Sequence, residues 1–368
     1  MLHVGIATSK RPAGLGNEIF VISKCLIGNR FFPGQVILPD YSKSCHEYPK
    51  FIKQFTSHNY SNKDFSTYKT HMTSNQDFLV LGNDVFSFFG DSTNRWDYGE
   101  ILQTVVKNLG IPRIGFVHAS GMLGKYLGIQ SAKEELRSLF DIRNTQSSDG
   151  LRIGVHLRGP DDKTFLRARL TKNSDFKIGE VIPQPGVWNM GLPIWYYRQM
   201  ISFTNEFSNI PVKFKIFSNL NSGDKRILEI QSFCQNLGAI AEVASSDLDL
   251  TICELTNSDL IIPSISSFSM LNIFLGNSRY IWPYESLFKH RNHVSIWSTE
   301  DVDSINFDSN SISNPETPKE EKSLRGLPMR FDFPEIYAEW LNNASPNSQT
   351  LDLINFDRLP LDRFNLHS

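Results

Sequence analysis

A short run of alternating residues near the middle of the chain restricts the fold most. Apolar residues alternate with other residues over Leu151–Leu157, and a period of two is typical of a β-strand. Gly159 and Pro160 end the run, so we expect a loop to begin there. His156 and Arg158 then lie at the carboxyl end of the strand, which in open α/β sheets faces the ligand crevice.

Arg158 is the first candidate for function. A guanidinium at this position presents a permanent charge and a planar set of donors that suits phosphate oxygens. The alternative interpretation is structural: Arg158 is a surface arginine, or it pairs with Asp161 or Asp162.

The same alternation of strands and helices recurs on both sides of a polar, turn-rich segment at Arg143–Gly150, which we interpret as a linker. This pattern predicts an α/β fold with two doubly wound, Rossmann-like domains that face each other. We expect an N-terminal domain at 1–148, a C-terminal domain at 149–300, and a linker, helix and tail at 301–368. The expected strands are 2–8, 35–40, 78–81, 151–157, 212–218, 260–263 and 279–282, and the expected helices are 19–29, 101–109, 131–140, 193–207, 225–237, 248–257 and 333–342. The segment 264–275 is expected to start as a loop and to continue as a helix.

Composition excludes several classes of protein. The 368 residues carry a net charge of −2, which argues against a nucleic-acid partner because such a surface usually needs basic excess. Four scattered cysteines indicate a reducing compartment without a disulfide framework. The sequence contains no apolar run of membrane-spanning length and no signal-peptide pattern, so we expect a cytoplasmic location with no integral membrane segment. The sequence is also compatible with peripheral association with a membrane.

Two glycines near the N-terminus suggest a dinucleotide-binding site. Gly14 and Gly16 follow the first expected strand, and Asp40 ends the second, where an acid that binds ribose would lie. Ile19 occupies the place of the third glycine, however, and the loop is longer than the tight turn that this fingerprint requires. An NAD(P)-dependent oxidoreductase therefore remains an alternative.

A second concentration of signal lies at Ser264–Ser269, where a hydroxyl-rich turn precedes a helix. Hydroxyls, amides and the helix dipole there favour an anion, although serine is also preferred as a structural N-cap. Asn219, just after the expected strand 212–218, could contact a ribose or a base; the turn that follows it is also an ordinary turn sequence. The sequence has no His/Cys cluster and no DxD pair near a strand end that would indicate a metal, and Asp161 with Asp162 alone does not establish one.

The order of four motifs resembles the fucosyltransferase superfamily, which includes α-1,2-, α-1,6- and protein O-fucosyltransferases. The resemblance covers about residues 4 to 282. The segment 14–20, GLGNEIF, is similar to the GxLGNQMF-type loop, and 155–161, VHLRGPD, to the HxRR-type motif. The segment 217–219, FSN, is similar to FSDD, and Asp249 through Ser269 to the block that ends in IIANSSFSWW.

The resemblance implies a GT-B fold, GDP-fucose as the donor, a glycan hydroxyl as the acceptor, and inverting transfer without a metal or a prosthetic group. Arg158 would bind the diphosphate as the catalytic residue. Donor contacts would come from His156, Asn219, Asp249, Ser266, Ser267 and Phe268, while Gly14, Gly16 and Asn17 would line the acceptor side of the cleft. Glu18, Asp161 and Asp162 are candidate bases by position only.

Several departures from the family pattern bear on the donor. Gly159 replaces the second arginine, Met270 and Leu271 replace the paired tryptophans, and Asn219 stands for the paired acids. The sequence therefore predicts a glycosyltransferase that most closely resembles the fucosyltransferases. A different sugar nucleotide, or a relative that binds nucleotide sugar or glycan without catalysis, is the further alternative.

Overall fold

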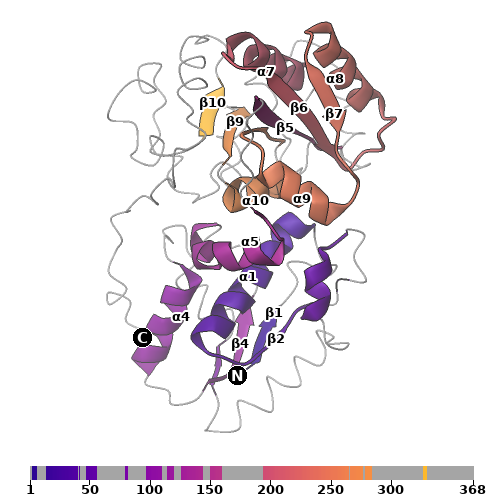
Figure 1. Cartoon of the computed structure of the whole chain (residues 1–368). Helices are drawn as coiled ribbons and strands as arrows, with labels where there is room; N and C mark the ends of the chain where they lie inside the picture. Colours follow the sequence, from indigo (N-terminus) through magenta and orange to yellow (C-terminus); the bar gives the residue numbers. More distant parts are fainter. Residues whose placement is uncertain are drawn as a thin grey trace, which may run out of the picture. The chain divides into compact units, whose positions relative to one another are not determined.

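The computed structural model describes residues 2–5, 14–39, 41, 47–55, 79–81, 97–109, 114–119, 126–143, 150–159, 194–264, 266–276, 278–283 and 326–329. The chain divides into two compact units, and the division in the middle of the sequence falls between Asp141 and Ile142. Figure 1 labels the helices and strands of both units. The domain boundaries that we placed at 148 and 300 stay predictions. None of the helices in the described part of the chain is both long enough and apolar enough to cross a membrane.

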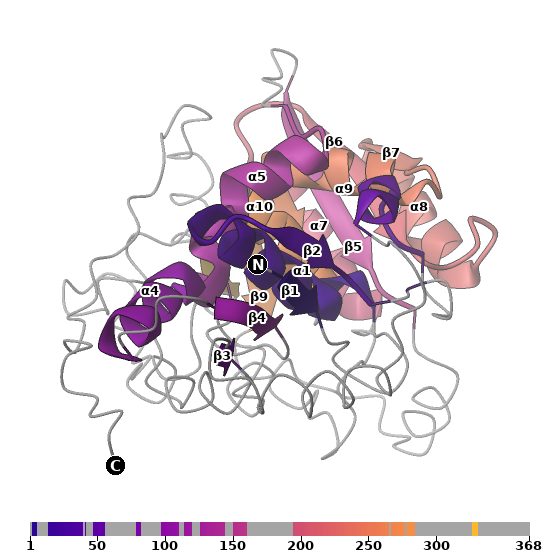
Figure 2. The same cartoon turned by 90° about the horizontal axis from the view of Figure 1, so that it is seen from below.

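Unit 1 contains a parallel four-stranded sheet in the order β2-β1-β4-β3 (Figure 2). Its first crossover runs from β1 through α1 to β2, the β-loop-α-β opening that the sequence predicts. In chain order the elements are β1 (Leu2–Gly5), α1 (Leu15–Phe31), β2 (Gln35–Ile37), the 3₁₀ helix η2 (Lys50–Gln54), β3 (Leu79–Leu81), α4 (Tyr98–Leu109), β4 (Ile114–Ala119), the 3₁₀ helix η3 (Leu127–Ala132) and α5 (Lys133–Leu139).

Helix α1 is buried on nearly every side, which the sequence analysis did not predict. We expected one apolar side over 19–29. The structure instead buries even the polar Glu18, Ser23 and Lys24. The reason is that α1 packs against β1, β2 and β4 of the sheet and also against α4 and η3. A helix enclosed between other elements in this way cannot keep a solvent-facing polar stripe.

Unit 2 contains a parallel six-stranded sheet in the order β7-β6-β5-β8-β9-β10. Numbered from β5, this order is 3-2-1-4-5-6, the strand order of the dinucleotide-binding fold. The α/β class with Rossmann-like parallel sheets, predicted from the sequence, is therefore confirmed. The elements are β5 (Leu151–Leu157), α7 (Ile194–Phe207), β6 (Val212–Ser218), α8 (Lys225–Asn236), β7 (Ile240–Val243), α9 (Leu248–Thr256), β8 (Leu260–Ile262), α10 (Ser267–Leu275), β9 (Arg279–Pro283) and β10 (Gly326–Met329).

Three strands were missed from the sequence. We took β9 as the last strand, but β10 pairs with it in parallel, from Gly326 opposite Tyr280 to Met329 opposite Pro283. The strands β4 and β7 were also overlooked. β7 has four residues, IAEV, and contains a half-buried alanine and an exposed glutamate. Such a short edge strand carries too little alternation to be recognised.

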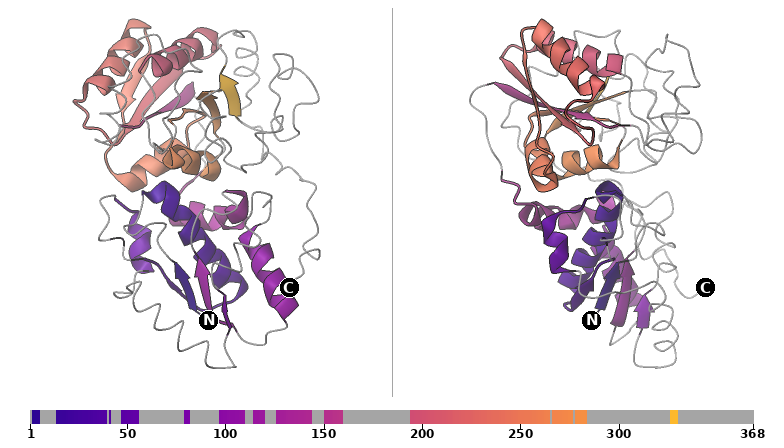
Figure 3. Two further views of the ribbon diagram at one scale, coloured as in Figure 1. Left: turned by 180° about the vertical axis from the view of Figure 1, so that it is seen from behind. Right: turned by 90° about the vertical axis from the view of Figure 1, so that its right-hand side faces the viewer.

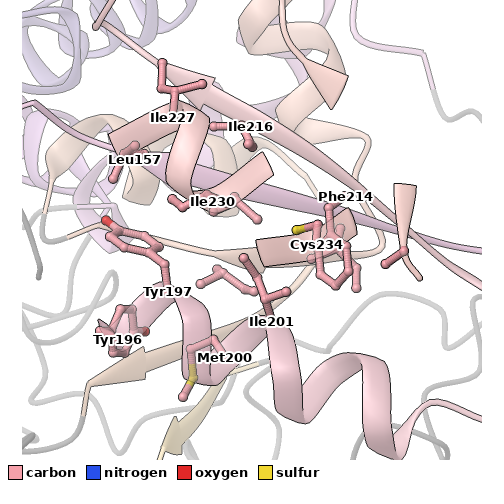
Figure 4. Packing of buried hydrophobic residues seen from close by; sticks show 14 of the residues in the cluster. Leu157, Tyr196, Tyr197, Met200, Ile201, Phe214, Ile216, Ile227, Ile230 and Cys234 are labelled. Carbon is pink, nitrogen blue, oxygen red and sulfur yellow. The ribbon is translucent and has the colours of Figure 1, made fainter. Parts of the chain in front are cut away.

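The sheet of unit 2 has helices on both faces (Figure 3). Ile153, Val155 and Leu157 of β5 point into a core shared with α7 and α8 (Figure 4). The intervening residues of β5 point to the other face. A Cβ atom on Gly154 would come within 2.5 Å of Leu255 Cδ1 of α9, and His156 contacts α10. Because side chains alternate along a strand, Arg158 follows His156 on the α9–α10 side.

Asp259 ties three strands together at their amino ends. Its carboxylate accepts hydrogen bonds from the backbone N–H of Arg152 at 2.8 Å and from the Arg152 guanidinium at 2.9 and 3.1 Å. Its own N–H donates to Arg152 O at 2.8 Å, and its carbonyl accepts from Arg279 N–H at 3.0 Å. These bonds set the register of β5, β8 and β9.

Replacing this carboxylate should destabilise unit 2. We expect Asp259→Ala to lower the free energy of unfolding by about 2 kcal/mol, because hydrogen bonds to charged groups contribute roughly 1.5–3 kcal/mol. The matched control is Glu229→Ala, whose ion pair with Arg198 is about half exposed on both sides and should contribute less than about 1 kcal/mol. Urea denaturation measures both. An equal effect of the two substitutions would contradict the structural role of Asp259.

Candidate functional site

The candidate site lies at the carboxyl ends of β5 and β8. The chain leaves β5 through α7 toward β6 on one side, and β8 lies on the other side of β5. Strand order therefore reverses between β5 and β8, and ligands of open α/β sheets bind at such a switch point. β5 continues to Leu157, while its last partner in β8 is Ile262, opposite Val155. This difference in length leaves His156 beside the turn that leads from β8 into α10.

Arg158 and Ser266 connect the two strand ends. Arg158 Nη1 donates to Ser266 Oγ at 3.0 Å. Ser266 is the N-cap of α10, and its Oγ also accepts from the Phe268 N–H at 3.2 Å. With two hydrogen bonds accepted, the Ser266 hydroxyl has only its proton left to offer. A guanidinium, a hydroxyl donor and the positive end of a helix thus meet in one place, an arrangement that suits an anion.

His156 is buried and neutral. It is 6% exposed, and burial, followed by the positive charge of Arg158, lowers its pKa to about 3. Its Nδ1 lies 2.5 Å from Ser269 Oγ and 3.0 Å from Ser264 Oγ. The Phe268 ring packs against the imidazole with the centroids 5.3 Å apart. The ring is therefore fixed between the sheet and the first turn of α10.

Tyr197 of α7 holds the backbone from the opposite face of the sheet. Its hydroxyl donates to His156 O at 3.1 Å. Burial raises the pKa of Tyr197 far above its usual range, and a hydrogen bond from the Arg158 backbone N–H opposes this rise. The phenol is consequently protonated and bridges the peptide groups on both sides of Leu157, which limits the positions that Arg158 can take.

Asn219 fixes the turn after Arg158. Its Oδ1 accepts from the Gly159 N–H at 2.9 Å. A Cβ atom on Gly159 would come within 2.3 Å of Leu220 Cδ2 and 3.0 Å of Leu220 Cγ, so the turn needs a glycine for close packing. The described contact gives Asn219 a role in shaping the turn, and its predicted contact with the donor stays a prediction.

The structure brings together a subset of the predicted residues. A chain of contacts joins Arg158 to Ser266, Ser266 to Phe268 and Phe268 to His156, and Ser267 begins α10 beside them. Asp249 lies in the first turn of α9. Sequence reasoning placed Ser264 and Ser269 in the hydroxyl-rich segment without giving them a role, and it missed Tyr197 and Leu220. Ser269 had a recognisable signal, since it stands three positions after the N-cap and so faces the sheet within the first turn.

Three predicted or alternative acids fall outside the residues that the structure describes: Asp40, Asp161 and Asp162. Nothing about their predicted roles is tested. Within the described part of the chain, no group of three or more His, Cys, Asp or Glu side chains is placed to hold a metal ion.

Helix α1 begins earlier than the sequence predicts. We expected the helix to start at Ile19, but it begins at Leu15 with Gly14 as its N-cap, so Gly16 and Asn17 lie in the first helical turn. Gly16 has a low intrinsic helix propensity, but the packing around α1 stabilises the helix at this position. Glu18 is fully buried. The pKa of Tyr41 is raised, first by burial of the phenol and then by the nearby charge of Glu18. This enclosed position does not favour a base that must reach a substrate.

Gly159→Ala tests the turn after Arg158. The added methyl should clash with Leu220 and destabilise unit 2 by about 1–3 kcal/mol, the usual range for overpacking. Gly223→Ala is the control, because its Cβ would meet only Asn221 Oδ1 at 3.7 Å. Thermal unfolding measures both variants. Adding Leu220→Ala to Gly159→Ala should restore part of the loss; no restoration would contradict the steric explanation.

The buried His156 should make folding sensitive to acid. Its pKa is lowered in the folded state, so the unfolded chain binds an additional proton below the usual histidine pKa of about 6.5. Stability is therefore intact above pH 6.5 and falls as the pH decreases, by up to about tenfold in the folding equilibrium per pH unit until about pH 3. His156→Gln should flatten this dependence in urea denaturation between pH 7.5 and 5. Parallel curves for the two proteins would refute it.

No known protein family and no curated protein matches the sequence. Three solved structures show low similarity to the fold. The E. coli heptosyltransferase WaaC with ADP-2-deoxy-2-fluoro heptose is 13% identical, with 76% of this chain and 88% of that chain covered and a TM-score of 0.35. POFUT1 in complex with GDP-fucose is 12% identical, with 75% and 95% covered and a TM-score of 0.35. Similarity at this level carries no argument about the activity of this chain.

Proposed function

We propose that this protein is a glycosyltransferase that binds the diphosphate of a nucleotide sugar at the carboxyl ends of β5 and β8. The observation that carries the proposal is the convergence of Arg158, the Ser266 hydroxyl and the start of α10 at the switch point of the sheet. These groups all donate hydrogen bonds or carry positive charge. A diphosphate is the ligand that matches such a set.

The chemistry follows from this binding mode. When the bond between the sugar and the diphosphate breaks, negative charge accumulates on the departing nucleotide. Arg158, held by Ser266, would stabilise that charge where it develops, and a permanent guanidinium suits this role. The acceptor hydroxyl would attack the anomeric carbon from the opposite side and invert its configuration. We propose that the transfer needs no metal.

We propose GDP-fucose as the donor and a glycan as the acceptor. Support comes from the order of the four sequence motifs. Two of them, around His156–Arg158 and Ser266–Ser269, meet in unit 2. Cytoplasmic location, with or without peripheral attachment to a membrane, stays a prediction from the sequence.

An NAD(P)-dependent oxidoreductase is the second candidate, because the 3-2-1-4-5-6 order of unit 2 is also that of dinucleotide-binding domains. The glycine fingerprint does not support it. Ile19 stands where the fingerprint has its third glycine, the residue that allows close packing of helix and strand.

A thermal-shift panel with GDP, UDP, CDP, GMP, NAD and NADP tests the proposed function. A ligand at 100 times its dissociation constant adds roughly 2.7 kcal/mol to stability, so binding should raise the melting temperature visibly. We expect GDP to produce the shift. A shift with UDP would keep the transferase and change the donor, and a shift with NAD or NADP alone would replace the proposal with the oxidoreductase.

Arg158→Ala should abolish the GDP shift and lower fucosyl transfer from GDP-fucose to glycan acceptors by at least about 100-fold, the usual effect of losing a group that stabilises charge in the transition state. Arg198→Ala is the control, because this arginine of α7 pairs with Glu229 and packs over Phe233. EDTA should leave the transfer unchanged. Full activity of Arg158→Ala would remove Arg158 from the mechanism.

A further inference from the structure

We infer that Ser269 is a positioning residue that fixes His156 as a neutral Nε2–H donor directed at the bound diphosphate nucleotide. This inference deepens the proposed function and rests on it. It assigns Ser269 a purpose beyond helix packing and His156 a definite tautomer.

The hydroxyl of Ser269 has a restricted choice of partners. Its Oγ accepts the Ser264 backbone N–H at 3.2 Å. The acceptors that the structure places near its proton are His156 Nδ1 at 2.5 Å and Ser264 Oγ at 3.5 Å. All three residues are buried, with Ser264 and Ser269 no more than 1% exposed, so water does not offer a substitute.

One tautomer of His156 gives a serine proton a nearby acceptor, and the other does not. If Nδ1 carried the proton, it could not accept, and the nearest acceptor for either serine proton would be the other hydroxyl at 3.5 Å. If Nδ1 is unprotonated, it accepts from Ser269 or Ser264 at 2.5 or 3.0 Å. The hydrogen bond at one imidazole nitrogen sets the proton on the other. The proton of the neutral ring therefore lies on Nε2.

The Nε2–H group has no protein acceptor among the residues that the structure describes. Nε2 does not belong to the buried side-chain atoms that lack a partner, so it is open to solvent, and a ligand atom can replace water as its acceptor. His156 and Arg158 lie two positions apart on the same face of β5. The ligand that Arg158 binds is therefore the one within reach of Nε2.

Two substitutions of His156 distinguish a hydrogen-bond donor at the position of Nε2 from one at the position of Nδ1. The amide nitrogen of glutamine extends about as far as Nε2, so His156→Gln keeps a donor there and has no tautomer to set. Asparagine reaches only as far as Nδ1. We expect His156→Asn to weaken GDP binding more than His156→Gln does, as measured by isothermal titration calorimetry.

A double-mutant cycle then tests Ser269. Ser269→Ala should weaken GDP binding by about 10-fold in the wild-type background, the upper range for one neutral hydrogen bond. The same substitution should change binding by less than about 2-fold in the His156→Gln background, because the two residues then no longer act together. Equal losses in both backgrounds would overturn the inference.

Thr204→Val is the matched control for losing a buried hydroxyl. Thr204 is fully buried in α7, and its hydroxyl donates to Met200 O at 2.7 Å. This variant should lower the melting temperature and leave GDP affinity unchanged. A loss of affinity equal to that of Ser269→Ala would mean that any weakening of unit 2 affects the site, and the positioning role would be withdrawn.

A ligand-free measurement decides the tautomer even if the variants fold poorly. Long-range ¹H–¹⁵N NMR of the wild-type protein should show His156 protonated on Nε2 alone, with its signal identified by its absence in His156→Gln. Adding GDP should shift the Nε2 resonance. A proton on Nδ1, or an Nε2 signal that saturating GDP leaves unchanged, would overturn the inference. Failure of the wild-type protein to bind any nucleotide would refute the proposed function instead, with the tautomer still read from the free protein.

Discussion

The pairing of β5 with β8 is the constraint on which the candidate site depends. These two strands are far apart in sequence, and Ile153–Val155 opposite Leu260–Ile262 is their whole contact along the ladder. The bonds of Asp259 secure the amino ends of this pair. At the carboxyl ends β5 extends beyond β8, and this offset lets the start of α10 approach His156. A shift of one residue in the register would move His156 and Arg158 to the other face of the sheet.

The two faces of β5 lie in different environments. One face contributes to an apolar core with α7 and α8, where dispersion and the hydrophobic effect need no direction. The other face carries a histidine among serine hydroxyls, where every polar group needs a partner of correct geometry. The apolar face can therefore tolerate some repacking, whereas on the polar face every hydrogen bond must keep its donor, acceptor and geometry. The same strand thus has one face that tolerates substitution and one face that does not.

Much of the fold of unit 2 was predictable because β5 and β6 alternate clearly and β8 is a short apolar run. The bounds of β5 and β6 agree with the sequence prediction, and α7, α8 and α9 differ by one residue at an end. β7 and β10 could not be found, since edge strands of four residues carry little periodicity. Arg158 and Ser266 were predictable as site candidates from strand ends and N-cap chemistry. The contacts of Ser269 with His156 were not, because they need the positions of residues more than a hundred apart in the sequence.

The position of β10 has a consequence for how the chain is made. The five strands from β7 to β9 are complete when synthesis reaches Pro283, but the strand that covers β9 starts only at Gly326. Until then, the outer side of β9 is an unpaired strand edge, and such edges attract other nascent or unfolded chains. The order of translation therefore creates an interval in which unit 2 is nearly folded yet vulnerable to aggregation. A chaperone that binds extended edges would be most useful during that interval.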